Sequence, residues 1–257
     1  MRIAFVVSGG DAPGINTALY HFAVQIHRFG EQLLGVQGGF PGLLEENYRH
    51  LGMKDLLPWA AMPGSILASS RVPVLAQEDA REKLADVIKN NAIDALVVFG
   101  GDGTLKHIPP LLASWGVPCI GIPTTIDNDV PGSEYTLGFD SACNFALPII
   151  DGIRATGAAL DGRIFTVETL GGYSGFLALE IARAVGADAV ARPEYPADIA
   201  DICDKLDYAV RHKGQALLVY TEGVTNKAEL LAAIPERTGI RIRSTMLGHA
   251  QRGGTPT

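Results

Sequence analysis

The sequence is poor in charge and contains no long uninterrupted hydrophobic run. Only 19% of its 257 residues are charged, and the formal net charge is −7. A negative net charge argues against a nucleic-acid-binding surface and against a polybasic membrane anchor. No apolar run approaches the ~20 residues that a helix needs to cross a bilayer. We therefore expect neither nucleic acid nor membrane among the partners.

Cysteine is also scarce. The three cysteines, Cys119, Cys143 and Cys203, are odd in number, far apart and form no metal-ligand pair. We expect small buried side chains in a reducing compartment rather than a disulfide framework or a metal site. The apolar run at residues 1–8 stops at a glycine pair and lacks the length and cleavage site of a signal peptide. These features predict a cytoplasmic protein.

Apolar residues and glycine are abundant, and they alternate along the chain in a regular way. Hydrophobic residues make up 47% of the sequence, and its 30 glycines suit many junctions between strands and helices. The continuous apolar strands predict parallel sheets that helices cover on both faces. Strands are predicted at residues 3–7, 33–36, 95–99, 119–122, 163–169 and 216–220, a glycine-rich turn at 38–42, and helices at 18–26, 80–90, 142–154, 174–185, 199–213 and 228–234. The pattern restarts after Phe139, so two α/β lobes with a boundary near Gly138 are expected.

Two of the predicted strands are followed by glycines, hydroxyls and carboxylates. The first segment is Gly100-Gly101-Asp102-Gly103-Thr104, and the second is Pro123-Thr124-Thr125-Ile126-Asp127-Asn128-Asp129. The carboxyl ends of parallel strands are where open α/β sheets bind ligands. Glycine lets the backbone approach a phosphate, and carboxylates hold Mg²⁺ or accept a proton. The pair favours phosphoryl transfer, although each segment alone is also compatible with an ordinary turn.

Other segments are weaker signals when taken singly. Residues 8–14, Ser-Gly-Gly-Asp-Ala-Pro-Gly, match neither standard nucleotide-binding fingerprint and suit a phosphate loop or a tight turn equally well. Residues 246–254 combine His249 and Arg252 with flexible backbone, just after Arg241 and Arg243. Each arginine alone is compatible with plain surface charge. Together they form a local excess of positive charge, as recognition of a phosphorylated substrate requires.

In combination and in this order, the segments resemble the 6-phosphofructokinase family. The resemblance rests on residues 8–16, the loop at 100–104, residues 125–129, Thr221-Glu222 and residues 248–254, and it covers essentially the whole chain. It implies two Rossmann-like lobes with the active site in the cleft between them. Residues 1–138 plus 251–257 would form the nucleotide-binding lobe and residues 139–250 the sugar-phosphate-binding lobe. It further implies transfer of a phosphoryl group to the 1-hydroxyl of fructose 6-phosphate.

The resemblance also implies roles for single residues. Asp127 matches the catalytic base, with Thr125 beside it, and Asp102 matches the Mg²⁺ ligand, with Asp129 in support. Phosphate-donor contacts are expected from Gly10, Arg71, Asp102, Gly103 and Thr104. Substrate contacts are expected from Thr125, Asp127, Arg163, Leu170, Gly171, Gly172, Glu222, Arg243, His249 and Arg252. In the family the arginines matching Arg163 and Arg243 come from a neighbouring subunit, so a homo-oligomer is implied.

The phosphate donor is partly readable from two positions. Diphosphate-using members of the family place Asp where this chain has Gly103, which favours ATP. At the second position ATP users have Gly and diphosphate users have Lys, whereas this chain has Thr124. Threonine supplies no cation in place of the missing part of the nucleotide. ATP with Mg²⁺ is therefore the predicted donor, and diphosphate is the alternative.

The sequence departs from the family pattern in three places. Gly172 stands where the family has its catalytic arginine, which predicts a slow kinase, a compensating cation such as Lys106, or a different acceptor. Residues 19–21, Leu-Tyr-His, replace an arginine of the bacterial nucleotide effector site. The chain ends at Thr257, where relatives continue, so the first lobe is expected to be incomplete. Two further hypotheses stay open: another sugar or nucleoside acceptor, and a non-catalytic sugar-phosphate-binding subunit.

Overall fold

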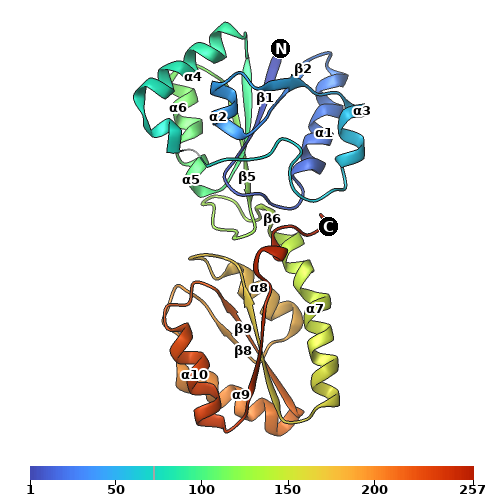
Figure 1. The fold of residues 1–257 in the computed structure, drawn as a ribbon, viewed down its shortest axis with the longest axis vertical. Coiled ribbons are helices and arrows are strands. Elements are labelled where there is room, and N and C mark those ends of the chain that lie inside the picture. The colour runs from blue at the N-terminus through green and yellow to red at the C-terminus, as the bar shows by residue number, and fades with distance from the viewer. Residues whose placement is uncertain (72) are drawn as a thin grey trace. The chain divides into compact units, whose positions relative to one another are not determined.

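The chain divides into two α/β units in a computed structural model, which describes residues 1–71 and 73–257 (Figure 1). The first unit comprises Met1–Thr125, Asp129–Gly138 and Thr255–Thr257, and the second comprises Ile126–Asn128 and Phe139–Gly254. No helix among the described residues has the length and apolar character that crossing a membrane would require.

The first unit is built on a mainly parallel sheet with the order β3-β2-β1-β4-β5-β6, in which only the pairing of β2 with the edge strand β3 is antiparallel. Its strands are β1 (Arg2–Ser8), β2 (Gln32–Val36), β3 (Tyr48–His50), β4 (Ala95–Gly100), β5 (Cys119–Thr125) and β6 (Leu137–Gly138). Its helices are α1 (Ile15–Arg28), α2 (Gly39–Leu44), α3 (Met53–Leu56), α4 (Glu78–Asn90), α5 (Asp102–Leu105) and α6 (Ile108–Ser114), with 3₁₀ turns η1 (Leu57–Trp59) and η2 (Pro73–Ala76).

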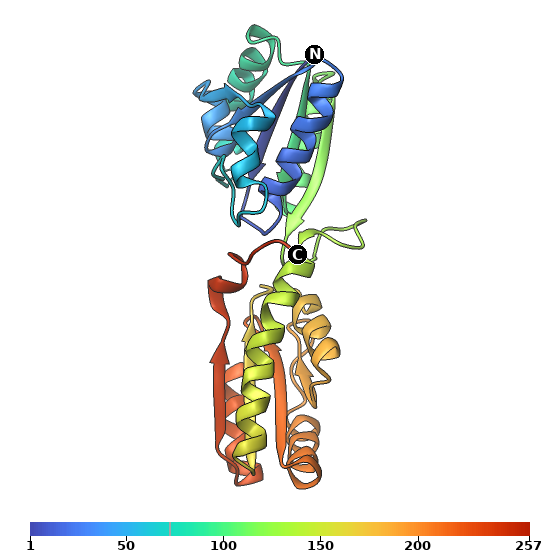
Figure 2. The same ribbon diagram turned by 90° about the vertical axis from the view of Figure 1, so that its right-hand side faces the viewer.

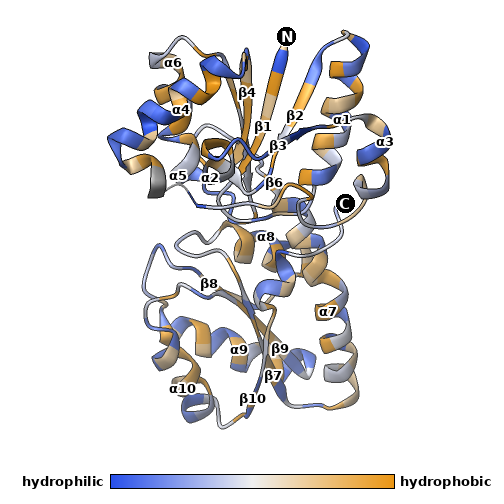
Figure 3. Ribbon diagram, turned by 45° about the horizontal axis from the view of Figure 1, so that its top comes forward, coloured by the Kyte–Doolittle hydropathy of each residue, from blue (hydrophilic) through white to orange (hydrophobic). Residues whose placement is uncertain are grey.

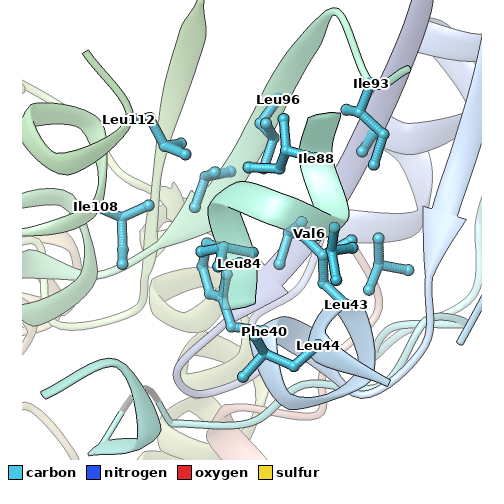
Figure 4. Packing of buried hydrophobic residues seen from close by; sticks show 14 of the residues in the cluster. Val6, Phe40, Leu43, Leu44, Leu84, Ile88, Ile93, Leu96, Ile108 and Leu112 are labelled. Atoms are coloured by element: carbon cyan, nitrogen blue, oxygen red, sulfur yellow. The ribbon is translucent and has the colours of Figure 1, made fainter. Parts of the chain in front are cut away.

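Both faces of this sheet are buried because its central strands are apolar on both sides. Val6 and Leu96 pack with α2, α4 and α6 on one face (Figure 4). Phe5 and Phe99 pack with α1 and α3 on the other face. Successive side chains of a strand point to opposite faces, so an unbroken apolar run predicts a sheet covered twice. Figure 3 shows the same pattern as hydrophobic colouring along the strands.

The second unit contains a parallel four-stranded sheet with the order β10-β7-β9-β8. Ile164 and Leu218 pack with α9 and α10 on one face. Phe165 points to the opposite face, where it lies close to Gly157 of α7, the long helix that runs beside the strands (Figure 2). The elements are α7 (Phe139–Ala159), β7 (Arg163–Thr169), α8 (Phe176–Val185), β8 (Ala189–Ala191), α9 (Ile199–Lys213), β9 (Gln215–Thr221), α10 (Lys227–Thr238), β10 (Ile242–Met246) and η3 (Gly248–Gln251).

The predicted α/β class, with mainly parallel sheets and helices on both faces, is confirmed. Two local expectations are wrong. The glycine-rich segment at residues 38–42 is not a turn but the start of helix α2, which glycines with positive φ at Gly38 and Gly39 lead into. Residues 251–254 group with the second unit rather than the first, because the Gln251 side chain bonds to Leu170 and Ala142.

The cysteines are free thiols, as expected. Cys143 and Cys203 are buried, and Cys119 is half-buried. Burial raises the pKa of Cys143 to about 12, and it also raises the pKa values of Cys119 and Cys203. These thiols are therefore protonated at neutral pH and suited to packing rather than to nucleophilic chemistry.

Candidate functional site

In the first unit, the predicted phosphate loops begin at one edge of the sheet. Ser8, Gly100 and Pro123 end or nearly end their strands and lie in register across β1, β4 and β5. The buried hydroxyls of Ser8 and Thr104 lie 3.1 Å apart and join the first two loops. The structure therefore brings the segments that carry Gly10, Gly103 and Thr104 to a common edge. This is the edge at which open parallel sheets bind ligands.

The first glycine loop is held by a segment that sequence reasoning did not single out. The Gly9 N–H donates to the Ser70 carbonyl over 2.9 Å, and the Ser69 hydroxyl donates to the Gly9 carbonyl over 2.7 Å. Ser70 also forms a parallel bridge with Ser8. Arg71 follows directly and is exposed, next in the chain to the two serines that hold this loop. An exposed arginine here is compatible with the predicted contact to a nucleotide phosphate.

Asp102 and Asp129 form an acidic pair in the first unit. Desolvation raises the pKa of the Asp129 carboxyl, a backbone hydrogen bond lowers it by less, and the negative charge of Asp102 adds the smallest effect, which raises it. No group of three or more potential metal-ligating side chains occurs among the described residues. Two carboxylates nevertheless fit Mg²⁺, which keeps several waters and binds through one or two carboxylates together with substrate phosphates. A bound cation would also relieve the repulsion between the two carboxylates.

In the second unit, the predicted sugar-binding segments leave another common edge. Thr169 and Thr221 lie in register at the carboxyl ends of β7 and β9, and Met246 of β10 pairs with Glu168. Beyond this edge lie the segments that carry Leu170, Gly171, Gly172, Glu222, His249 and Arg252. Their convergence supports one substrate-binding surface at this end of the sheet.

The loop after β7 is tightly packed against the loop after β9. The Gly172 N–H donates to Glu222 Oε1 over 3.2 Å. A Cβ at Gly223 would lie 1.9 Å from the Gly172 carbonyl oxygen, so a side chain at residue 223 would displace the loop. Gly171 has φ +133°, and a Cβ there would lie 2.7 Å from the Ser174 carbonyl oxygen. Glycine at residues 171 and 223 is therefore a requirement of backbone contact.

Asp127, the predicted base, groups with the second unit although Thr125 and Asp129 group with the first. The Ser174 hydroxyl donates to the Asp127 carbonyl oxygen over 2.9 Å. The next residue, Asn128, has φ +53°, a left-handed conformation that asparagine tolerates better than most residues. Asp127 is thus anchored to the loop that begins at Leu170.

Arg163 and Arg243 lie at the opposite end of the same sheet. Arg163 is the first residue of β7, and Arg243 pairs with Phe165 across the β7–β10 ladder. At about 3.3 Å per residue, β7 places Arg163 about 20 Å from Thr169, more than an arginine side chain can span. Within this chain, therefore, the Arg163 side chain does not reach the Leu170–Gly172 loop.

The two arginines instead line a groove beside α7. Its volume is about 410 Å³, and Ile149, Ile153 and Leu160 contribute apolar side chains to it. The charge of Arg241 lowers the pKa of Arg243, with smaller contributions from burial and Arg163. The Arg163 Nε atom is buried and has no hydrogen-bond partner among the described residues. A half-apolar groove with two clustered cations is suited to an anionic partner.

Gly172, which the resemblance matches to a catalytic arginine, has room for a side chain in this structure. Gly172 has φ +56°, and a Cβ built there would meet no atom within 4 Å. Lys106, proposed from the sequence as a compensating cation, is exposed and directly follows α5 in the first unit. In the second unit, Lys227 lies 3.0 Å from Glu168 Oε2, below the edge where the sugar-binding loops begin. This pair could not be found from sequence, because neither residue belongs to a recognisable motif.

The chain was compared with known proteins. The family model described as Phosphofructokinase matches residues 2–257. The ATP-dependent 6-phosphofructokinase 1 of Thermus thermophilus is 39% identical over 259 residues, which cover 100% of this chain and 80% of that protein. The ATP-dependent 6-phosphofructokinase 1 of Clostridium perfringens is also 39% identical, with the same coverage of both chains.

Solved structures give the same result for the fold. Pichia pastoris phosphofructokinase in the T-state matches with a TM-score of 0.91 and 28% identity over 99% of this chain. The phosphofructokinase of Saccharomyces cerevisiae matches with a TM-score of 0.88 and 27% identity over 100% of this chain. This chain spans only 30% and 39% of those two longer chains. A pyrophosphate-dependent phosphofructokinase from Marinobacter aquaeolei, at 21% identity and a TM-score of 0.81, shares the fold.

Proposed function

Since this chain belongs to the phosphofructokinase family, we propose that it transfers the terminal phosphoryl group of ATP to the 1-hydroxyl of fructose 6-phosphate, the 6-phosphofructokinase reaction of glycolysis. The observation that carries this proposal is the anchoring of Asp127 to the sugar-binding loop through Ser174. This bond holds the backbone of Asp127 beside the acceptor-binding segments, and we infer that its carboxylate takes the proton from the attacking hydroxyl. These reactants are also the basis for a cytoplasmic location.

Each residue then has a defined task. Asp127 accepts the proton of the 1-hydroxyl. At the same time, the oxygen of that hydroxyl forms a bond to the transferred phosphorus, and the bond between this phosphorus and ADP breaks. Thr125, two residues earlier in the chain, contacts the sugar together with Glu222 and His249. Asp102 and Asp129 would hold Mg²⁺, which supplies positive charge that offsets the charge developing on the phosphate oxygens. Gly10, Gly103 and Thr104 bring backbone and a hydroxyl to the phosphate donor, with Arg71 as a cation.

The remaining arginines support a homo-oligomer. Arg163 lies about 20 Å along β7 from the end that leads to the acceptor loop, and Arg243, which pairs with Phe165, lies about 13 Å from that end. They therefore serve a site in a neighbouring copy, where they and the Arg252 of that copy hold the sugar 6-phosphate. Such a site is incomplete in a single chain. The apolar side chains around the arginine groove provide surface for that contact.

Mixing two inactive variants tests this shared site. Asp127→Asn removes the base, and Arg243→Ala removes a phosphate contact, so each variant alone is expected to be nearly inactive. A mixed dimer contains one site with both the intact aspartate and the intact arginine. After unfolding and refolding together in equal amounts, about a quarter of the wild-type activity should return, since half of randomly formed dimers are mixed. No recovery would refute the sharing of sites between copies.

A coupled assay of ADP release, with fructose 6-phosphate and Mg²⁺, tests the main activity. Asp127→Asn should lower kcat by a factor of about 10² to 10⁴ with little change in the KM of ATP. A panel of sugar and nucleoside acceptors, run in parallel with ATP and diphosphate, separates the alternative reactions.

Gly172 favours one further candidate, a non-catalytic sugar-phosphate-binding subunit. Calorimetric binding of fructose 6-phosphate without turnover under any donor would establish that candidate and exclude the kinase.

A further inference from the structure

Gln251 is a polar side chain that is completely buried. Its exposed fraction is 0%, and it lies at the end of η3, between His249 and Arg252, which are predicted to bind the substrate. Both ends of its amide are bonded. Oε1 accepts from the Leu170 N–H over 3.0 Å, and Nε2 donates to the Ala142 carbonyl over 3.2 Å. A buried amide of this kind is stable only while both bonds are made.

The two bonds of Gln251 join three elements of the second unit. Leu170 follows β7 and opens the loop with Gly171 and Gly172, whereas Ala142 belongs to the first turn of α7. These partners are 81 and 109 residues away from Gln251 in the sequence. The backbone hydrogen bond from the Leu247 N–H to the Glu168 carbonyl, 3.0 Å long, fixes the same segment against the end of strand β7. Gln251 therefore connects segments that no local turn connects.

The loop that Gln251 holds also reaches the predicted base. From Leu170 it continues to Ser174, whose N–H donates to the Gly171 carbonyl over 2.9 Å and whose hydroxyl donates to the Asp127 carbonyl. The Gly172 N–H is fixed by Glu222. One hydrogen-bonded chain thus runs from the His249–Arg252 segment through Gln251 and the loop to Asp127.

We propose that Gln251 is a positioning residue for the acceptor site, which sets the loop that carries Gly172 and bonds to Asp127 against the segment that carries His249 and Arg252. This inference rests on the proposed function for its kinetic part and on the hydrogen bonds alone for its structural part. Misplacement of about 1 Å among groups that must act on one substrate lowers turnover strongly. Gln251 touches no substrate itself and acts through the two segments that it joins.

Gln251→Met tests the proposal, because methionine has a similar length and volume and makes neither bond. We expect kcat/KM for fructose 6-phosphate to fall at least about tenfold, which corresponds to ~1.4 kcal/mol. The KM of ATP should change by less than about twofold, since the bonds of Gln251 lie wholly within the second unit. Gln251→Glu, which keeps the acceptor for the Leu170 N–H, should be less impaired than Gln251→Met.

A matched control separates positioning from general loss of stability. Leu206 is fully buried in α9, in the cluster formed with Ile164 and Leu218 on the other face of the sheet from α7. Leu206→Ala should lower the melting temperature while leaving the KM of fructose 6-phosphate unchanged. Hydrogen exchange gives a readout that needs no activity: the peptide containing Leu170 should lose protection in Gln251→Met and keep it in Leu206→Ala.

The outcomes separate the two proposals. Absence of wild-type turnover with fructose 6-phosphate would refute the proposed function, and the exchange measurement would still decide on the role of Gln251. Normal kinetics in Gln251→Met, or equal exchange at Leu170 in both variants, would overturn the positioning role. An equal rise in the KM values of ATP and fructose 6-phosphate would also overturn it, because it would indicate general loosening. If Gln251→Met does not fold, Gln251→Glu, which loses the bond to Ala142, is used instead, and a KM of fructose 6-phosphate equal to that of Leu206→Ala would overturn the positioning role.

Discussion

Placing an arginine at Gly172 tests the proposed role of this position in transfer of the phosphoryl group. The structure allows the change, since a Cβ at this position meets no atom within 4 Å. The cost is in the backbone, because Gly172 has φ +56° and a left-handed L-residue costs about 1–2 kcal/mol. For a unit of this size, we expect the melting temperature to fall by several degrees.

The gain comes from charge placed where the phosphoryl group passes. Removal of one preorganised donor from such a site typically costs about 2.7–4 kcal/mol in turnover. An arginine introduced at Gly172 has no packing that holds it in place, so we expect it to recover about half of that energy. Gly172→Arg should therefore raise kcat with fructose 6-phosphate by about tenfold to thirtyfold. A slow wild-type enzyme and a faster but less stable variant are the combined expectation.

The coupled ADP-release assay measures this effect, and Gly172→Met is the matched control. Methionine at this position must also adopt the left-handed backbone conformation, and its side chain is of comparable length but carries no charge. Both variants should lose a similar amount of thermal stability, while only the arginine variant gains turnover. Equal kcat values for the two variants would refute the reasoning and indicate another acceptor or another source of positive charge.

Four other predictions concern single residues. Gly103 is exposed, and a Cβ at this position would meet nothing within 4 Å, so Gly103→Asp should leave the melting temperature unchanged. In steady-state kinetics, the same change should lower kcat/KM for ATP about tenfold or more, because the new carboxylate repels the phosphates. The Thr221 hydroxyl is buried without a hydrogen-bond partner in the described part of the chain, so Thr221→Val should stabilise the protein by about 1 kcal/mol in denaturant titrations, and a loss of stability would contradict this. Lys227→Met leaves the Glu168 side chain, of which only 11% is exposed, with the Tyr220 hydroxyl as its neighbour. Because Lys227 is itself one-third exposed, we expect the free energy of unfolding to fall by about 1–2 kcal/mol in denaturant titrations. The raised pKa of Asp129 means that this carboxyl takes up a proton at a higher pH than an ordinary aspartate, and Mg²⁺ competes with that proton. The Mg²⁺ concentration needed for half-maximal activity should therefore rise as the pH falls. This rise should be smaller in Asp129→Asn.

Much of the fold was predictable because its strands are buried on both faces. An unbroken apolar run such as residues 95–99 has few alternatives to a central parallel strand. Short edge elements were missed: β8 has only three residues, Ala189–Ala191, and its sequence has no feature that separates a strand from a loop. The start of α2 was missed because Gly39 and Gly42 are poor helix formers, and only packing against the strands makes that segment helical.

The candidate site was predictable residue by residue but not in its connections. The resemblance to the family assigned roles to His249 and Arg252, yet Gln251 between them has a function only once Leu170 and Ala142 are seen to meet it. The same holds for Ser174, whose bond to Asp127 joins residues 47 positions apart. Contacts of this kind depend on the register of β7, β9 and β10, which no local pattern encodes.

The length of strand β7 has a consequence for how this protein behaves in dilute solution. The strand separates Arg163 from the acceptor loop by about 20 Å, so under the proposed sharing of sites a single copy contains no complete site. Specific activity should then fall on dilution, with a midpoint equal to the dissociation constant of the assembly. A defective copy would also inactivate a site that it shares with an intact neighbour. A mutation in one allele would therefore have a dominant-negative effect.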